Sequence, residues 1–199
     1  MLPYRLKAFK FWTSIIGILY IWNLPNLSFI GFAESNSKSV SAFIANPPAT
    51  GAMAAVSFMP MTLMWQYQNI IIYKEYKDTS INNIVTTSLC TYQVCFSLFL
   101  ICTDGYVPGW LHFTTVVLFC LSFFVHAGCI VYYFNPSNYT KIIFGIGSSS
   151  LVVLLIIVVF QLQDKGMWFY IMECIGLTCM FLFTPLEWYS ILNKNVVDT

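Results

Sequence analysis

Long apolar stretches with almost no charge inside them recur along this chain, and they constrain its fold more than any other feature. A helix needs about 20 mostly apolar residues to cross the hydrocarbon core of a bilayer. Six stretches fit this description, at residues 9–31, 52–73, 83–103, 109–134, 141–162 and 167–192. Charged residues make up only 9% of the chain, against roughly a quarter in soluble domains. We therefore predict an all-α, polytopic membrane protein, with residues 1–199 forming one domain of six transmembrane helices.

The distribution of Lys and Arg predicts the orientation of these spans. With six spans the two termini share one side of the membrane. That side holds seven of the nine basic residues: Arg5, Lys7, Lys10, Lys74, Lys77, Lys141 and Lys194. The other side holds only Lys38 and Lys165. Because cytosolic loops are enriched in Lys and Arg, we expect both termini to be cytosolic.

The connections between the spans predict one antiparallel bundle, because four of the five are short. The exception is the first lumenal or extracellular loop, at about residues 33–51. It is rich in Ser, Asn and Pro and contains a small apolar patch, so we expect it to act as a lid or as a surface for a partner. The residues that we assign to this role are Ser39, Val40, Ser41, Phe43 and Ile44. Asn23 and Pro25 interrupt the first span and predict a kink or an early exit there.

Polar and ionisable residues inside the spans are costly and therefore mark candidate sites. At 1.5 Å of rise per residue they fall into two levels. His112 and Glu173 lie at the lumenal level, and Gln66, Asn69, His126 and Glu187 lie in the cytosolic leaflet. A functional interpretation makes each level a pocket for a lipid headgroup or an ion. The structural alternative is a network of interhelical hydrogen bonds, each worth about 0.6–2 kcal/mol.

Pairs of small residues predict where helices approach each other closely. Gly51 with Ala55, and Gly145 with Ser149, have the four-residue spacing typical of such contacts.

The sequence contains few elements of a catalytic or cofactor-binding site. It has no nucleophile elbow, phosphate loop or dinucleotide fingerprint. Two histidines do not build a three-histidine zinc site, and no Cys/His spacing replaces one. A Ser/His/Glu arrangement that uses Ser148, Ser149 or Ser150 stays open. The net charge of +1 argues against nucleic acid as a partner. We expect a non-catalytic protein without metal or cofactor.

Three short motifs resemble the Frag/DRAM/Sfk family of six-span membrane proteins, most closely its branch for remodelling of GPI-anchor lipids. They are Ser39-Val40-Ser41 with Ile44 and Pro47 or Pro48, His126 before a small apolar run, and Trp168-Phe169-Tyr170 through Glu173. The chain departs from the family pattern at Lys38 and Ala45, and Thr184-Pro185-Leu186-Glu187 stands where a histidine is expected. The resemblance implies an endomembrane protein (Golgi, endoplasmic reticulum or lysosome) or a plasma-membrane protein that acts on membrane lipids or GPI-anchor lipids.

These observations lead to one expected function and two alternatives. We expect a protein of lipid homeostasis that binds or organises membrane lipids, with the six polar residues of the two levels as the binding residues. The first alternative is a structural accessory subunit of a larger complex of membrane proteins. The second is a subunit of an oligomeric channel, in which Glu173 or Asp104 would repeat around a symmetry axis.

Overall fold

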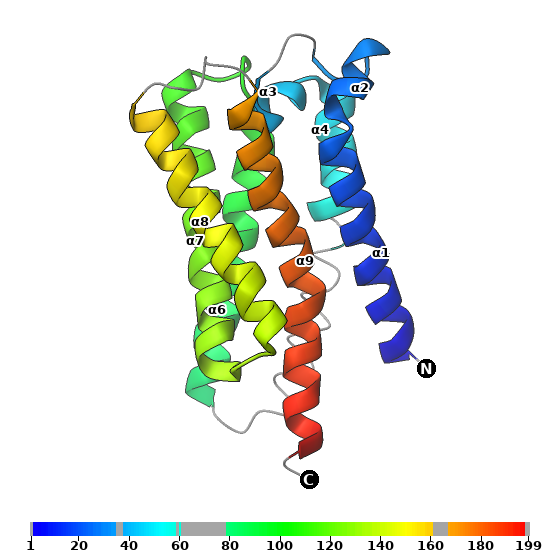
Figure 1. The fold of residues 1–199 in the computed structure, drawn as a ribbon, viewed down its shortest axis with the longest axis vertical. Coiled ribbons are helices and arrows are strands. Elements are labelled where there is room, and N and C mark those ends of the chain that lie inside the picture. Colours follow the sequence, from blue (N-terminus) through cyan, green and yellow to red (C-terminus); the bar gives the residue numbers. More distant parts are fainter. Residues whose placement is uncertain (1, 35–37, 59, 61–78, 161–166, 198–199) are drawn as a thin grey trace.

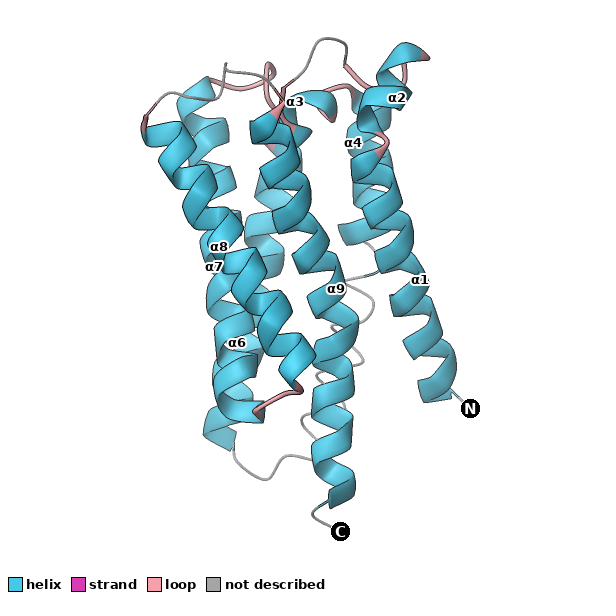
Figure 2. Ribbon diagram, in the orientation of Figure 1, coloured by secondary structure: helices cyan, strands magenta, loops and turns pink. Residues whose placement is uncertain are grey.

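The computed structural model describes residues 2–34, 38–58, 60, 79–160 and 167–197. This part of the chain is helical, with loops between the helices and no strand (Figure 2). The helices are α1 (Leu2–Trp22), α2 (Leu24–Phe29), α3 (Val40–Phe43), α4 (Pro47–Met53), the π-helical segment η1 (Ala54–Phe58), α6 (Thr79–Ile101), α7 (Gly109–Phe134), α8 (Asn138–Val159) and α9 (Trp168–Val197).

Four of these helices are long and apolar enough to cross a membrane. They are Ser80–Ile101, Gly109–Phe134, Asn138–Val158 and Trp168–Leu186, and Ala8–Trp22 is a shorter apolar helix. The sequence-based prediction of helices over the last four spans is therefore confirmed. The start of α1 and the end of α9 lie at one end of the bundle, which we call the terminal end; α2 and α3 lie at the other, which we call the loop end (Figure 1).

The first predicted span breaks where its sequence indicates. α1 ends at Trp22 and α2 begins at Leu24, with Asn23 as a turn between them. Pro25 lacks the N–H that would bond to the carbonyl of Ile21 four residues earlier. That carbonyl instead accepts a hydrogen bond from the Tyr170 hydroxyl of α9, at 2.5 Å. The last helix therefore satisfies a backbone group that the break in the first helix leaves open.

The second predicted span is described only at its beginning. α4 begins at Pro47, a residue type suited to the first turn of a helix, and continues into η1. Most of the predicted range 52–73 lies outside the described residues.

α9 is the central helix of the described bundle. It makes extensive contacts with α8 and α1, while α6 packs mainly against α7. α8 lies at the periphery, since only 11% of its most apolar 18-residue stretch is buried inside the protein.

The small residues that bring α8 and α9 together are not those expected from the sequence. Gly145 and Ser149 are exposed on the outer face of α8, and Gly51 and Ala55 are exposed as well. The close approach instead uses two other pairs. A Cβ at Gly147 would lie 3.0 Å from the Cβ of Cys179, and one at Gly176 would lie 2.9 Å from the Ser150 hydroxyl oxygen.

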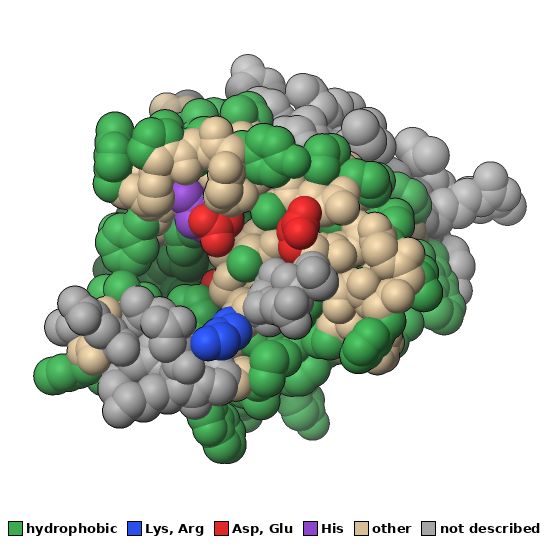
Figure 3. All heavy atoms as spheres, turned by 90° about the horizontal axis from the view of Figure 1, so that it is seen from above, with side chains coloured by type: hydrophobic (Ala, Val, Ile, Leu, Met, Phe, Trp, Pro, Cys, Tyr) green, Lys and Arg blue, Asp and Glu red, His purple; other side chains and the backbone are tan. Residues whose placement is uncertain are grey.

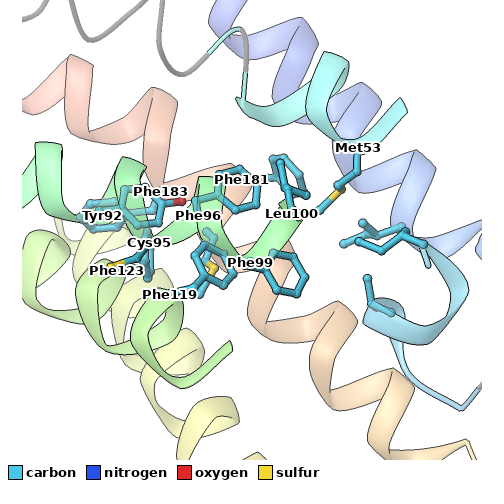
Figure 4. Packing of buried hydrophobic residues seen from close by; sticks show 14 of the residues in the cluster. Met53, Tyr92, Cys95, Phe96, Phe99, Leu100, Phe119, Phe123, Phe181 and Phe183 are labelled. Atoms are coloured by element: carbon cyan, nitrogen blue, oxygen red, sulfur yellow. The ribbon is translucent and has the colours of Figure 1, made fainter. Parts of the chain in front are cut away.

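Aromatic side chains fill the core between α6, α7 and α9 (Figure 4). Phe96 stacks on Phe119 with ring centroids 4.8 Å apart, and Phe119 stacks on Phe99 at 5.3 Å. Phe183 of α9 meets Phe123 edge to face at 5.8 Å. Aromatic pairs of this kind add about 0.5–1.5 kcal/mol each beyond their buried area, so this cluster fixes the position of α9 against α6 and α7.

Candidate functional site at the loop end

The predicted lid segment folds into α3 and packs onto the bundle. Ser39 has an extended backbone, and its hydroxyl caps the helix by accepting a hydrogen bond from the Ala42 amide at 3.0 Å. The amide of Glu34 donates to the carbonyl of Phe43 at 3.0 Å, which closes the loop on itself. A short polar segment therefore acquires a defined shape through its own hydrogen bonds.

The apolar side chains of this segment face the protein. Val40, Phe43 and Ile44 are at most 3% exposed, and Ser41 is also buried. The Phe43 ring meets Tyr170 of α9 edge to face, with centroids 5.3 Å apart. The apolar side chains of this segment are therefore covered by the bundle.

Glu173 ties α3 to α9. Its Oε2 accepts a hydrogen bond from the Val40 amide at 2.5 Å, across 133 residues of sequence. The amide belongs to the first residue of α3, where helical N–H groups lack partners within the helix. The other carboxylate oxygen, Oε1, makes no hydrogen bond within the described part of the chain. Glu173 is half-buried, and Asp104 and Cys120 lie within electrostatic range of it.

His112 joins the end of α6 to the start of α7. Its Nδ1 lies 2.7 Å from the carbonyl oxygen of Cys102. Because a carbonyl only accepts, Nδ1 carries the proton. In the neutral imidazole Nε2 is then a hydrogen-bond acceptor. Nε2 has no hydrogen-bond partner among the described residues. His112 and Glu173 lie at the same end of the bundle, but no hydrogen bond joins them.

Charged groups gather on the face at the loop end. Acidic and histidine side chains lie next to each other there and border a hollow with apolar walls (Figure 3). The described ionisable groups of this end are Glu34, Lys38, Asp104, His112 and Glu173. Among them, the Glu173 and Asp104 carboxylates suit an ammonium group, and the Lys38 ammonium suits a phosphate.

The second predicted level is described only at His126. This residue is 2% exposed, and its ring stacks on Tyr92 with centroids 6.2 Å apart. The Ser88 hydroxyl donates to the Val85 carbonyl at 2.8 Å, so His126 Nδ1 donates to the Ser88 oxygen at 3.0 Å. His126 is thus held inside the protein. Gln66 and Asn69 lie outside the described residues, and so does the side chain of Glu187.

Two residues of the described bundle escaped the sequence analysis. Tyr170 appeared there only in the family motif, yet it satisfies the open carbonyl of Ile21. Lys10 was counted only among the basic residues on the side of the termini, but it is 3% exposed inside the protein. The sequence offers a signal for the burial of Lys10. One face of α1 carries, at the helical period, Lys10, Ser14, Gly17 and Ile21. Ser14 and Ile21 on that face are also buried.

No metal centre forms within the described ranges, where no three His, Cys, Asp or Glu side chains come together. No protein-family model, no curated protein and no solved structure matches this chain. The resemblance to the Frag/DRAM/Sfk family therefore rests on its short motifs alone.

Proposed function

We propose that this chain is an integral membrane protein with six spans and both termini in the cytosol. The four long apolar helices support insertion into a membrane. The common position of the start of α1 and the end of α9 supports an even number of crossings (Figure 1). The excess of Lys and Arg on the terminal side supports the cytosolic assignment.

In this membrane the protein acts in lipid homeostasis by binding a phospholipid headgroup, without catalysis, at the loop end. The observation that carries this proposal is the Glu173 carboxylate, which lies within a candidate span and uses only one oxygen to hold α3. Intramembrane carboxylates are rare and usually serve a function. Three groups remain for a ligand: the second oxygen of Glu173, Nε2 of His112, and Asp104. α3 is the lid that covers this ligand.

The charges at this end favour a zwitterionic headgroup. Glu173 and Asp104 suit its ammonium group, and His112 Nε2 is a further acceptor for it, while Lys38 suits its phosphate. GPI-anchor lipids carry both kinds of group, which agrees with the family resemblance. An endomembrane or the plasma membrane is the compartment that this resemblance implies.

Native mass spectrometry in mild detergent, with release and identification of bound lipids, tests the proposal. Wild-type protein should retain a phospholipid or GPI-type lipid, and Glu173→Gln and Glu173→Ala should lose it. Glu34→Gln is the matched control, because it also removes a carboxylate from the loop end but at an exposed position. Retention of the same lipid by the Glu173 variants would refute the proposal.

One observation favours the alternative role of an accessory subunit. α8 is peripheral, and its outer face carries Gly145 and Ser149, beside Met172 and Ile175 of α9. Small residues on an open helix face allow another helix to approach closely. If this role holds, cross-linkers placed at Ser149 should capture one defined membrane protein, and the purified chain should be free of lipid.

A further inference from the structure

A groove runs along the outside of the bundle between α6 and α7. It has a volume of about 600 Å³. Its walls combine apolar side chains, such as Leu118 and Leu121, with hydroxyl and amide groups. It lies apart from Glu173 and α3, because its residues occupy the part of α6 and α7 nearer the terminal end.

A stripe of polar residues lines the α6 side of the groove. Asn83, Thr87 and Thr91 recur every fourth residue, so they lie on one helix face, and all three are exposed. Within the described chain, the Asn83 amide and the Thr87 hydroxyl make no hydrogen bond. Polar groups that face hydrocarbon without a partner are unfavourable, so this surface needs a ligand with polar atoms of its own.

Two further hydroxyls of the groove, those of Thr91 and Ser122, add to what such a ligand must provide. Thr91 donates its proton to the Thr87 carbonyl at 2.9 Å, and Ser122 donates to the Phe119 carbonyl at 2.9 Å. Their oxygen lone pairs are then left as acceptors. Because the Asn83 amide and the Thr87 hydroxyl can also donate, the groove fits a ligand group that both donates and accepts, such as a hydroxyl. None of its lining residues is charged, so nothing in it selects a phosphate.

The length of the groove distinguishes a lipid from a partner helix. From Asn83 to Cys95 it follows twelve residues of helix, or about 18 Å. This is close to the hydrocarbon depth of one leaflet, about 15 Å, whereas a transmembrane partner would follow the full 30 Å. Asn83 lies one turn from the beginning of α6, so the polar end of the groove is at the headgroup boundary of that leaflet.

We propose that this groove binds an uncharged, hydroxyl-bearing lipid of the leaflet at the terminal end, with its hydroxyl between Asn83 and Thr87 and its apolar body along the rest of the groove. Sterols, diacylglycerols and ceramides share this chemistry. The proposal rests on the membrane insertion proposed above, but not on the headgroup site at Glu173.

Photolabelling of the full chain in phosphatidylcholine vesicles tests this site. Separate samples contain a photoreactive sterol, a photoreactive diacylglycerol or a photoreactive ceramide, and mass spectrometry locates the adducts. We expect adducts on α6 and α7 along the groove, and the sample with the strongest labelling identifies the source. Thr87→Phe places a ring in the groove and should abolish most of this labelling. Val94→Phe, at an exposed position of α6 outside the groove, should keep it.

A matched pair of threonines tests the hydrogen bond itself. Thr87 and Thr114 are both exposed, but only Thr87 lines the groove, and its hydroxyl makes no hydrogen bond within the described chain. Thr87→Val should weaken half-maximal labelling about fivefold, the value of one net hydrogen bond, while Thr114→Val should leave it unchanged.

Three outcomes would overturn the proposal. Labelling that Thr87→Phe leaves intact, or adducts spread over all exposed helices, would show that the groove is not a site. A photo-cross-link to a second protein chain through the groove would assign it to a partner instead. Extraction of the chain by alkaline carbonate would refute membrane insertion, and with it both proposals. Lipid retained through Glu173, measured on the same samples, reports the loop-end site separately.

Discussion

The hydrogen bond between Glu173 and Val40 predicts how firmly α3 closes the loop end. A hydrogen bond to a charged group contributes about 1.5–3 kcal/mol, and one between neutral groups about 0.5–1.5 kcal/mol. Glu173→Gln keeps an oxygen as acceptor but removes the charge, so it should lower the free energy of opening α3 by about 1 kcal/mol. Glu173→Ala removes the acceptor altogether and should lower it by about 2 kcal/mol.

The apolar side chains of α3 limit this effect. Burying Val40, Phe43 and Ile44 contributes roughly 1.5–3 kcal/mol for each side chain, which exceeds the hydrogen bond. The variants should therefore leave α3 docked in most molecules and increase only how often it opens.

Hydrogen exchange with mass spectrometry of the peptide over residues 38–46 measures this opening. Differences of 1 and 2 kcal/mol correspond to exchange that is about 5 and 30 times faster. Peptides from α8 should exchange as in the wild type, and Glu34→Gln should match the wild type throughout. Unchanged exchange in α3, or faster exchange in all helices, would refute a local role for Glu173 as the anchor of α3.

Two further predictions concern the packing of α1 against α9. Tyr170→Phe leaves the Ile21 carbonyl without its hydroxyl donor and should lower the free energy of unfolding by about 1–3 kcal/mol, measured by chemical denaturation in detergent; an unchanged value would mean that another group satisfies the carbonyl. Gly17→Ala places a Cβ 2.6 Å from the Phe181 ring and should cost about 1–3 kcal/mol, seen as a lower melting temperature. Gly51→Ala meets nothing within 4 Å and serves as the control, so equal effects of the two alanines would contradict this packing.

The sequence was sufficient to predict the long helices and the break in the first one. α6 to α9 follow from hydropathy, because a long apolar segment without charges has few other stable conformations. The break at Asn23 follows from Pro25, whose missing N–H is a local property. Both are determined by residues that are close together in the chain.

The faces of the helices were harder to predict. Gly145 with Ser149 and Gly147 with Ser150 have similar spacing along α8, but only the second pair packs against α9. In a helix that is apolar all round, hydropathy does not distinguish the face toward protein from the face toward lipid. The distinction depends on which residues α9 presents.

The candidate site shows the same limit. In the sequence, Glu173 and the Ser39–Ile44 segment stand out separately, and His126 stands out without Ser88. The bond from Val40 to Glu173 spans 133 residues, and no local pattern indicates it. Contacts of this kind depend on the packing of the whole bundle.

The pairing of the first helix with the last also has a consequence for biosynthesis. Ile21 and Tyr170 are 149 residues apart, and a ribosome adds about 5–20 residues per second. About 7–30 s therefore pass between the synthesis of Ile21 and that of Tyr170, and the Ile21 carbonyl lacks its hydroxyl donor for that time. Variants that weaken this pairing should first reduce the fraction of newly made chains that assemble, and only afterwards affect the stability of the finished protein.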